Sequence, residues 1–203
     1  MKPLVIWDWN NTLVDTMEAS FLAMRDVSEY YQVPFVSRDD LMRVIGTHRT
    51  YWQTTFGAKE QEAVHYYLKR YACYRDTIKV IQGAKEVLEF VQSKNVMQII
   101  LSNEDMSLLV PETEYTGLAP YFTRICGTID EHGKPEVAFA LNALNGLDYD
   151  HLILVGDGIS DMQMADVLGA VSICVFNNVS TDVLSDYRCQ TLDEVKVILQ
   201  KLL

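Results

Sequence analysis

A short apolar run that ends in a carboxylate is the feature that most constrains this chain. Residues 5–7 have the length and character of a buried strand, and Asp8 follows directly. Asn10 and Asn11 come next, and asparagine tolerates a left-handed backbone better than most residues. We therefore predict a strand that stops at Asp8 and a sharp turn after it. In open α/β sheets, ligands bind at the edge where the strands have their carboxyl ends, and Asp8 would lie at this edge. Taken alone, the stretch could also be a strand end with a solvated Asp.

From residue 83 onward, helical and strand patterns alternate. We predict strands at 96–101, 125–126, 152–155 and 171–176. Helices are expected at 84–94, at 136–144, from a capping box of Ser160 and Gln163 to Leu168, and after Thr191. Strands separated by helices indicate a parallel sheet covered on both faces. The predicted fold class is α/β, a Rossmann-like three-layer sandwich with a central parallel sheet.

The segment between the first strand and residue 78 has a helical pattern instead. We predict a helix from residue 16 that Pro34 interrupts and a short helix from Ser37 through Val44 that Gly46 ends. A loop at 47–50 and a helix at 58–75 follow. The predicted organisation is a core of residues 1–14 and 78–203 with an α-helical cap of residues 15–77 inserted into it.

The net charge of the chain limits which partners it is expected to bind, and its cysteines indicate the redox state of its compartment. The net charge is −11, and no cluster of Lys or Arg stands out, so nucleic acid is not expected as a partner. Four scattered cysteines without metal-ligand spacing indicate reduced thiols. The first strand is too short for a signal peptide, and no apolar run is long enough for a membrane span. We expect a cytoplasmic monomer or homodimer without membrane contact.

Polar residues follow several of the predicted strands. Asp8, Ser102 and Asp157 each come at a strand end, and a parallel sheet places such ends at one edge. Asp161 lies one helical turn after Asp157, and Lys134 precedes a predicted helix. Clustered carboxylates favour a cation with hard oxygen ligands, which points to Mg²⁺. A carboxylate, a metal, a hydroxyl and a lysine together suit phosphoryl transfer.

These residues form a pattern that resembles the haloacid dehalogenase superfamily. The segment from Asp8 to Asp15, then Ser102-Asn103, Lys134-Pro135 and Gly156 to Asp161 look like its four motifs in the right order and spacing. The helical block after the first motif resembles the small helical cap of that superfamily, and the phosphoglycolate-phosphatase-like branch is the most similar. The resemblance implies hydrolysis of a small phosphorylated metabolite, such as phosphoglycolate or a sugar phosphate.

The resemblance also implies roles for individual residues. Asp8 would be the nucleophile that forms an aspartyl-phosphate. Asp8, the backbone carbonyl of Asn10 and Asp157 would hold Mg²⁺, and Asp161 would orient metal-bound waters or Lys134. Lys134 would be a catalytic residue together with Asp8 and Asn10.

The phosphoryl group would be bound by further residues of these motifs. The resemblance implies that Thr12, Ser102 and Lys134 contact its oxygens, and Asn103 can donate hydrogen bonds beside them. Structural roles are the alternatives: Thr12 could cap the turn and Ser102 could cap the next helix.

Asn10 is the main departure from the family pattern. Phosphatases of this family usually carry a second Asp at this position, which protonates the leaving oxygen and then activates water. An asparagine side chain cannot supply or take a proton, and such catalysis typically contributes about 10²- to 10⁴-fold. We expect attenuated hydrolysis and faster turnover in Asn10→Asp. Glu18, Glu104 and Asp105 are possible stand-ins, and the sequence favours none of them.

The predicted loop at 47–50 resembles a substrate-specificity loop of capped relatives. Arg49 would meet a distal anionic group of the substrate, and His48 is a weaker candidate beside it. A surface turn is the alternative.

Loss of catalysis is the competing hypothesis for the whole chain, because Asn10 could leave a protein that only binds or senses a phosphorylated ligand. A phosphoglucomutase-like reaction ranks below hydrolysis, because it would need a proton shuttle at the position of Asn10.

Overall fold

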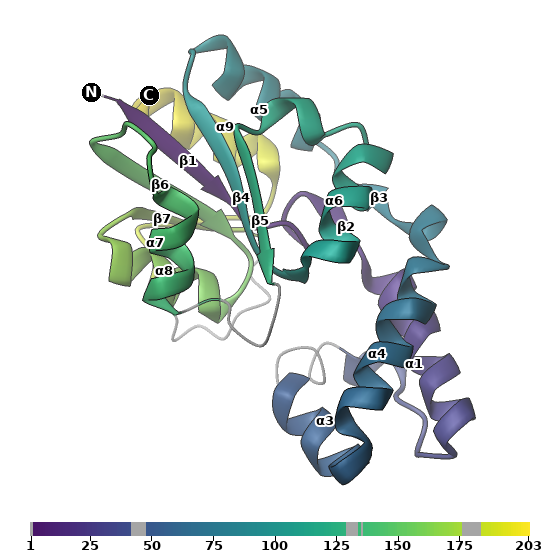
Figure 1. Cartoon of the computed structure of the whole chain (residues 1–203). Helices are drawn as coiled ribbons and strands as arrows, with labels where there is room; N and C mark the ends of the chain where they lie inside the picture. Colours follow the sequence, from purple (N-terminus) through teal and green to yellow (C-terminus); the bar gives the residue numbers. More distant parts are fainter. Residues whose placement is uncertain (1, 42–47, 129–133, 135, 176–183) are drawn as a thin grey trace. The chain divides into compact units, whose positions relative to one another are not determined.

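The computed structural model of the chain is shown in Figure 1. It describes residues 2–41, 48–128, 134, 136–175 and 184–203, and for residues 48 and 49 it describes the backbone alone. The chain forms two compact units, one of Met1–Asp15 with Lys79–Leu203 and one of Thr16–Ile78.

The first unit contains a parallel sheet of six strands. Every neighbouring pair in this sheet runs parallel. In spatial order the strands are β5 (Arg124–Thr128), β4 (Met97–Asp105), β1 (Pro3–Trp7), β6 (His151–Gly156), β7 (Val171–Val175) and β8 (Tyr187–Cys189). The predicted α/β class with a central parallel sheet is confirmed.

Strand β1 lies in the interior of this sheet, between β4 and β6. Its residues 4–7 are fully buried, as expected for an apolar strand with neighbours on both sides. Trp7 is in register with Ile100 of β4 and with Val155 of β6. The backbone N–H of Asp8 then donates to the carbonyl of Val155 at 2.9 Å. This pairing places the Asp8 carboxylate at the carboxyl edge of the sheet, next to the ends of two neighbouring strands.

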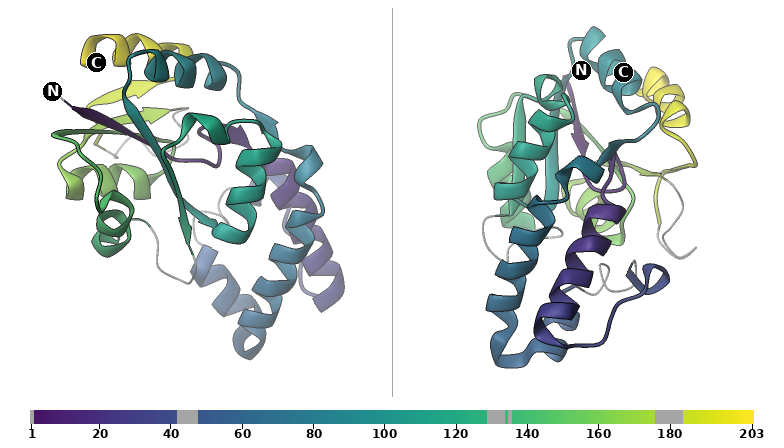
Figure 2. Two further views of the ribbon diagram at one scale, coloured as in Figure 1. Left: turned by 45° about the horizontal axis from the view of Figure 1, so that its top comes forward. Right: turned by 90° about the vertical axis from the view of Figure 1, so that its right-hand side faces the viewer.

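Helices cover both faces of the sheet. On one face, α7 (Val137–Leu144) and α8 (Ile159–Leu168) join the apolar cluster of Leu4, Ile6 and their neighbours. On the other face, α5 (Ala84–Ser93) lies beside α9 (Leu192–Leu202), as Figure 2 shows. In the described part of this unit, the remaining helical segments are α6 (Met106–Tyr115) and η3 (Ala119–Tyr121).

The sheet region differs from the prediction in the extent of β4 and in three short strands. Strand β4 runs through Asp105, so Ser102 lies within the strand and not at its end. The strand β8 and a two-stranded antiparallel ribbon of β2 (Val14–Asp15) and β3 (Lys79–Val80) were not predicted. Their two or three residues each are too short for a period of two to show.

The start of α8 also differs from the prediction. The side chain that caps this helix belongs to Asp161, whose Oδ2 accepts a hydrogen bond from the N–H of Gly158 at 2.9 Å. The predicted pair of Ser160 and Gln163 was wrong, because α8 begins one residue before Ser160.

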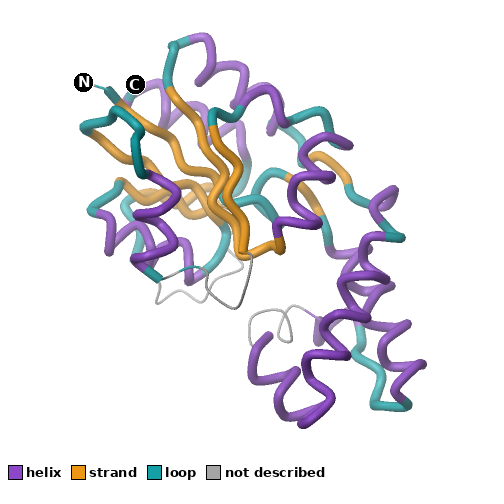
Figure 3. The backbone as a smooth tube through the Cα atoms, in the orientation of Figure 1, coloured by secondary structure: helices purple, strands orange, loops and turns teal. Residues whose placement is uncertain are grey.

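The unit Thr16–Ile78 consists of helices and loops in its described part (Figure 3). The helical segments are α1 (Met17–Tyr31), α3 (His48–Phe56), η1 (Gly57–Lys59), α4 (Glu60–Ala72) and η2 (Arg75–Thr77). Helix α1 ends three residues before Pro34, with Gln32 in the left-handed region at a φ of 56°. In the predicted short helix, the N–H of Asp40 donates to Ser37 Oγ at 3.2 Å. The predicted end of that helix at Val44 and Gly46 lies outside the described residues.

The predicted loop at 47–50 was wrong from residue 48 onward, where α3 begins. The buried ring of Trp52 stacks on Phe56 at 5.1 Å and meets Tyr67 of α4 at 5.5 Å. Burial of this aromatic face against α4 stabilises a helix that the polar residues at its start did not suggest.

Candidate active site

The carboxylate of Asp8 is held by both of its oxygens. Lys134 Nζ donates to Oδ1 at 2.6 Å, and Thr12 Oγ1 donates to Oδ2 at 3.1 Å. Asp8 is only 6% exposed and Thr12 is fully buried. The turn after the strand has Asn11 at a φ of 58°, and it brings Thr12 back towards Asp8. The side chain of Asp8 therefore has a fixed orientation at the sheet edge.

Lys134 lies between two carboxylates. Its Nζ contacts Asp8 and also Oδ1 of Asp161, and all three side chains are buried. Burial alone would lower the pKa of Lys134, but the charges of Asp161 and Asp8 raise it well above the usual range. The lysine therefore stays protonated. Its backbone N–H donates to Oδ1 of Asn103 in β4 at 2.7 Å, which holds the backbone of Lys134 at this strand.

Gly156 makes room for Asp161. A Cβ on Gly156 would lie 2.4 Å from Cγ of Asp161, closer than non-bonded carbons approach. The Asp161 carboxylate is thereby packed onto the end of β6 while it caps α8 and contacts Lys134. One side chain thus links the helix, the strand and the lysine.

Asp157 completes a cluster of three carboxylates. Asp8, Asp157 and Asp161 each offer one oxygen, and these oxygens lie within 4.8 Å of one another. Burial raises the pKa of Asp157 and of Asp161 above the usual range, and the negative charge of Asp8 raises both further. One lysine does not balance three carboxylates. A divalent cation with hard oxygen ligands fits this set of donors.

Asn10 is bound to a glutamate that the sequence did not single out. Its Nδ2 donates to Oε2 of Glu104 at 2.6 Å, and the N–H of Asp105 donates to Oε1 of the same carboxylate at 3.2 Å. Burial raises the pKa of Glu104 to about 6, and the charge of Asp8 contributes to this rise. Oδ1 of Asn10 is buried and has no hydrogen-bond partner among the described residues.

Glu18 and Asp105, the other acids that could replace the missing proton donor, have local structural contacts. Glu18 pairs with Arg38 within the unit Thr16–Ile78, where Nη2 of the arginine lies 2.9 Å from Oε1. Oδ1 of Asp105 accepts the N–H of Ser107 at 2.8 Å and so caps α6. Nothing in the sequence separated Glu104 from these two acids, because its contact with Asn10 joins residues 94 positions apart.

The remaining predicted residues fall into two groups. Ser102 is buried, and its Oγ accepts the N–H of Glu104 at 3.1 Å. It does not cap α6, because Asp105 does. Arg49 and His48 lie in the first turn of α3, and their side chains lie outside the described part of the chain.

Among the described helices, none is long and apolar enough to cross a membrane.

Two curated proteins that are similar to this chain are both named phosphatases. A protein of Dickeya dadantii named "Probable phosphatase IndB" is 29% identical over 191 residues, which cover 86% of this chain and 81% of that protein. A phosphoglycolate phosphatase of Agrobacterium fabrum is 27% identical over 188 residues, with the same coverage of each chain.

A solved structure has the same fold. A haloacid dehalogenase-like family hydrolase of Streptococcus pneumoniae superposes with a TM-score of 0.84 at 19% identity, over 97% of this chain and 98% of that one. The family model of haloacid dehalogenase-like hydrolases matches residues 5–175, a range that contains every motif described above. This chain therefore belongs to the haloacid dehalogenase-like hydrolase family, as its motifs predicted.

Proposed function

We propose that this hydrolase is a Mg²⁺-dependent phosphatase that acts on a small phosphorylated metabolite. The observation that carries the proposal is the buried contact of Lys134 with Asp8 and Asp161, beside a third carboxylate on Asp157. Such a site combines a fixed carboxylate nucleophile with positive charge for a phosphoryl group. The names of the two curated relatives support the same reaction class.

In the proposed reaction, an oxygen of Asp8 attacks the phosphorus of the substrate. A bond forms between this oxygen and phosphorus, the bond from phosphorus to the alcohol oxygen breaks, and the alcohol oxygen takes a proton from solvent. Water then attacks the phosphorus of the aspartyl-phosphate, and the bond from phosphorus to the Asp8 oxygen breaks. Phosphate leaves with the water oxygen, a proton goes to solvent, and the Asp8 carboxylate is restored. Thr12, Ser102 and Lys134 bind the phosphoryl oxygens, and Asn103 holds the backbone of Lys134 in place.

The metal would be held by Asp8, Asp157 and the backbone carbonyl of Asn10. Asp161 would orient its waters or Lys134. When bound, Mg²⁺ supplies positive charge to the phosphoryl oxygens. The excess of carboxylates over Lys134 supports this assignment, since the cluster is otherwise unbalanced.

Asn10 attenuates both steps in this proposal. Its amide cannot donate a proton to the leaving oxygen or take one from water. A loss of about 10²- to 10⁴-fold follows for substrates that need this help. Substrates with good leaving groups lose least in the first step.

The substrate class is the part of the proposal that rests on resemblance. Phosphoglycolate and sugar phosphates fit the relatives, and the unit Thr16–Ile78 would act as a cap whose Arg49 and His48 meet a distal anionic group. We propose a cytoplasmic monomer or homodimer that binds neither nucleic acid nor membranes.

The test is a phosphate-release screen with Mg²⁺ on activated and natural phosphomonoesters. We expect turnover that Asp8→Asn abolishes and that EDTA removes. Asp193→Asn, on the exposed start of α9, is the matched control and keeps wild-type rates. A complete lack of turnover on the whole panel would contradict the proposal.

A phosphate-ligand-binding protein without catalysis is the second candidate, and the amide at position 10 is the observation in its favour. The two candidates differ in covalent chemistry. An aspartyl-phosphate trapped on Asp8 after incubation with an activated phosphomonoester excludes pure binding. Ligand affinity without covalent adduct or turnover favours it.

A further inference from the structure

We propose that Glu104 is a positioning residue for Asn10, and that the two side chains form a matched acceptor and donor pair. The inference rests on the proposed function for its kinetic part. In this pair, Glu104 holds the amide nitrogen of Asn10 and thereby leaves the amide oxygen free for the reacting water or the substrate. The pair also accounts for an asparagine at a position where family phosphatases use an aspartate.

The chemistry of the contact determines how the amide is turned. An ionised carboxylate only accepts hydrogen bonds, and the Glu104 carboxylate receives two, from Nδ2 of Asn10 and from the N–H of Asp105. The NH₂ group of Asn10 must therefore face Glu104. Its Oδ1 then points away from this carboxylate, and this oxygen is buried without a partner among the described residues.

A buried acceptor without a partner is unfavourable, so it is expected to have one in the working enzyme. Asn10 lies two residues after Asp8, and its side chain occupies the place of the family's proton-transfer group. A water molecule that attacks the aspartyl-phosphate could donate one hydrogen to Oδ1 and be oriented by it. Orientation requires no proton transfer, so an amide can provide it.

The backbone of Glu104 is held from several sides. Its N–H donates to Ser102 Oγ at 3.1 Å, and its carbonyl accepts Thr128 Oγ1 at 3.3 Å. A Cβ on Gly127 would lie 2.5 Å from this carbonyl, so glycine is what lets β5 approach so closely. The register between β4 and β5 also shifts between Leu101 and Asp105, where four steps along β4 oppose two along β5. This irregular strand end presents the Glu104 side chain to Asn10.

The same contact explains why aspartate is unsuited to position 10 in this chain. An aspartate there would place a second carboxylate about where the amide nitrogen now lies, 2.6 Å from Oε2 of Glu104. Two like charges at this distance repel strongly. With glutamine at position 104 the polarity can be reversed, because the glutamine amide donates to an aspartate at position 10.

The experiment compares wild type with Asn10→Asp, Glu104→Gln, Glu104→Ala and the double variant Asn10→Asp/Glu104→Gln. The readouts are kcat and KM with p-nitrophenyl phosphate and Mg²⁺, and the Tm without substrate. Circular dichroism checks folding. Glu114→Ala, on the exposed face of α6, is the matched control and leaves every readout unchanged.

We expect Glu104→Ala to lower kcat by about ten- to a hundredfold with little change in KM. Glu104→Gln keeps kcat closer to wild type than Glu104→Ala does, because the one amide oxygen can still accept from Asn10, although the N–H of Asp105 then loses its side-chain acceptor. Asn10→Asp alone lowers the Tm by about 2–4 °C. It gains less activity than the sequence pattern alone predicts, because Glu104 lies beside the new carboxylate. The double variant regains the Tm and exceeds Asn10→Asp in kcat by about tenfold or more.

Two results would overturn the inference. If Glu104→Gln is as slow as Glu104→Ala, Glu104 transfers protons and does not merely position the amide. If Asn10→Asp keeps the wild-type Tm and the two substitutions act additively, the side chains are not a matched pair. A wild type without turnover would overturn the proposed function, whereas the Tm comparison would still decide whether the pair exists.

Discussion

Lys134 joins two carboxylates that are distant in the sequence, and its removal tests the electrostatics of the site. Lys134→Met leaves Asp8 and Asp161 buried without their cation. We expect the free energy of unfolding to fall by about 3–5 kcal/mol, because breaking a buried pair leaves an uncompensated charge. Urea denaturation without metal measures this change.

Mg²⁺ is expected to restore part of that loss, since it would bind the same carboxylates. Lys85→Met is the control, because Lys85 forms an exposed i,i+4 pair with Glu89 at 3.9 Å that contributes little. Equal losses in the two variants would show that the buried charges near Lys134 are balanced in some other way.

The raised pKa values of Asp157 and Asp161 predict how Mg²⁺ binding depends on pH. A carboxyl group with a raised pKa is protonated at a higher pH than usual, so protons compete with the metal. We expect the Kd for Mg²⁺ to rise as the pH falls from about 8 towards about 6, with protons released on binding. Isothermal titration calorimetry in buffers of different ionisation enthalpy measures both effects.

Asp157→Asn is the informative variant for this pH dependence. It removes a group that titrates in the window, so binding becomes weaker and less dependent on pH. A Kd that is constant over the window in wild type would mean that the carboxylates are already ionised before the metal binds.

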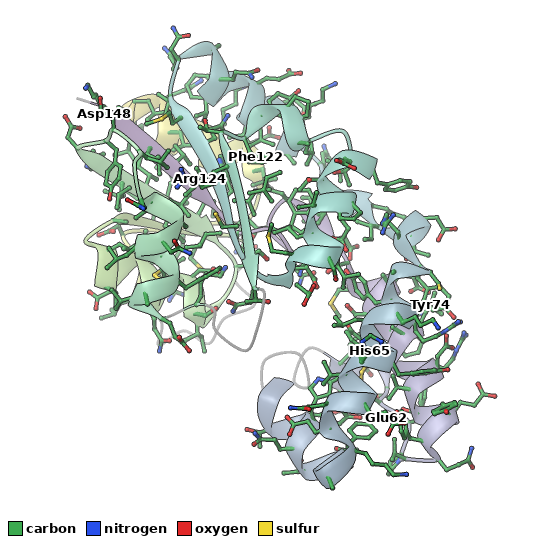
Figure 4. The ribbon with its side chains drawn as sticks, viewed as in Figure 1. Glu62, His65, Tyr74, Phe122, Arg124 and Asp148 are labelled. Atoms are coloured by element: carbon green, nitrogen blue, oxygen red, sulfur yellow. The ribbon has the colours of Figure 1, made fainter. Side chains whose placement is uncertain are left out.

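At the scale of elements, Arg124 ties β5 to the end of α7. Its Nη1 lies 2.5 Å from the carbonyl of Ala143 and 2.9 Å from that of Asn145, which belong to the last turn of α7 and the residue after it. Figure 4 labels this side chain beside the helix. A cation that donates to these carbonyls stabilises the helix end.

Arg124→Met is therefore expected to lower the free energy of unfolding by about 1–3 kcal/mol. Both hydrogen bonds come from Nη1, so the single ammonium of Arg124→Lys keeps the charge and can still donate, and its loss should be smaller than that of Arg124→Met. Chemical denaturation measures both variants. Wild-type stability in Arg124→Met would show that solvent satisfies these carbonyls equally well.

In the unit Thr16–Ile78, Asp26 connects α1 to the end of α4. Its Oδ2 accepts Tyr74 Oη at 2.6 Å and Arg70 Nε at 2.7 Å, and Tyr74 is labelled in Figure 4. Burial would raise the pKa of Asp26, but the hydrogen bonds from Tyr74 and Arg70 outweigh it and hold this pKa below the usual range. The network therefore stabilises the ionised form.

The sign of the pH dependence follows from this lowered pKa. The contribution of Asp26 is present in full above the ordinary aspartate pKa of about 4 and is lost as the pH falls through the lower folded value. Asp26→Asn should lower the free energy of unfolding by about 1–3 kcal/mol at neutral pH and by progressively less in acid. Denaturation curves across this range test it, with exposed Asp39→Asn as the control. A loss that is the same at every pH would contradict it.

At the scale of the whole molecule, sequence patterns predicted the fold well where elements are long and periodic. The sheet strands that hold Asp8 and Asp157 were predicted, and Asp8, Thr12, Lys134 and Asp161 are brought together as the motifs suggested. Helix α3 was missed because its stabilisation comes from burial of Trp52 against Tyr67 and not from its own residues. Long-range packing of this kind leaves no local pattern.

Sequence patterns were limited in the same way in predicting contacts at the active site. The distance from Asn10 to Glu104 depends on the irregular end of β4 and on the space left at Gly127. Neither feature follows from spacing along the chain, so Glu104 could not be chosen over Asp105 beforehand. A motif specifies which residue types gather at a sheet edge, whereas packing decides which of their neighbours they contact.

The place of β1 within the sheet has a consequence for folding during synthesis. This first strand needs β4 and β6 as neighbours, and β6 ends at Gly156. An emerging chain therefore carries an apolar strand with unpaired edges until β6 has left the ribosome. The helical unit Thr16–Ile78, rich in local contacts, can form meanwhile. Chains that stop before β6 would lack Asp157 and Asp161 and would expose β1 to aggregation, so both the chemistry and the solubility of this enzyme depend on completing that strand.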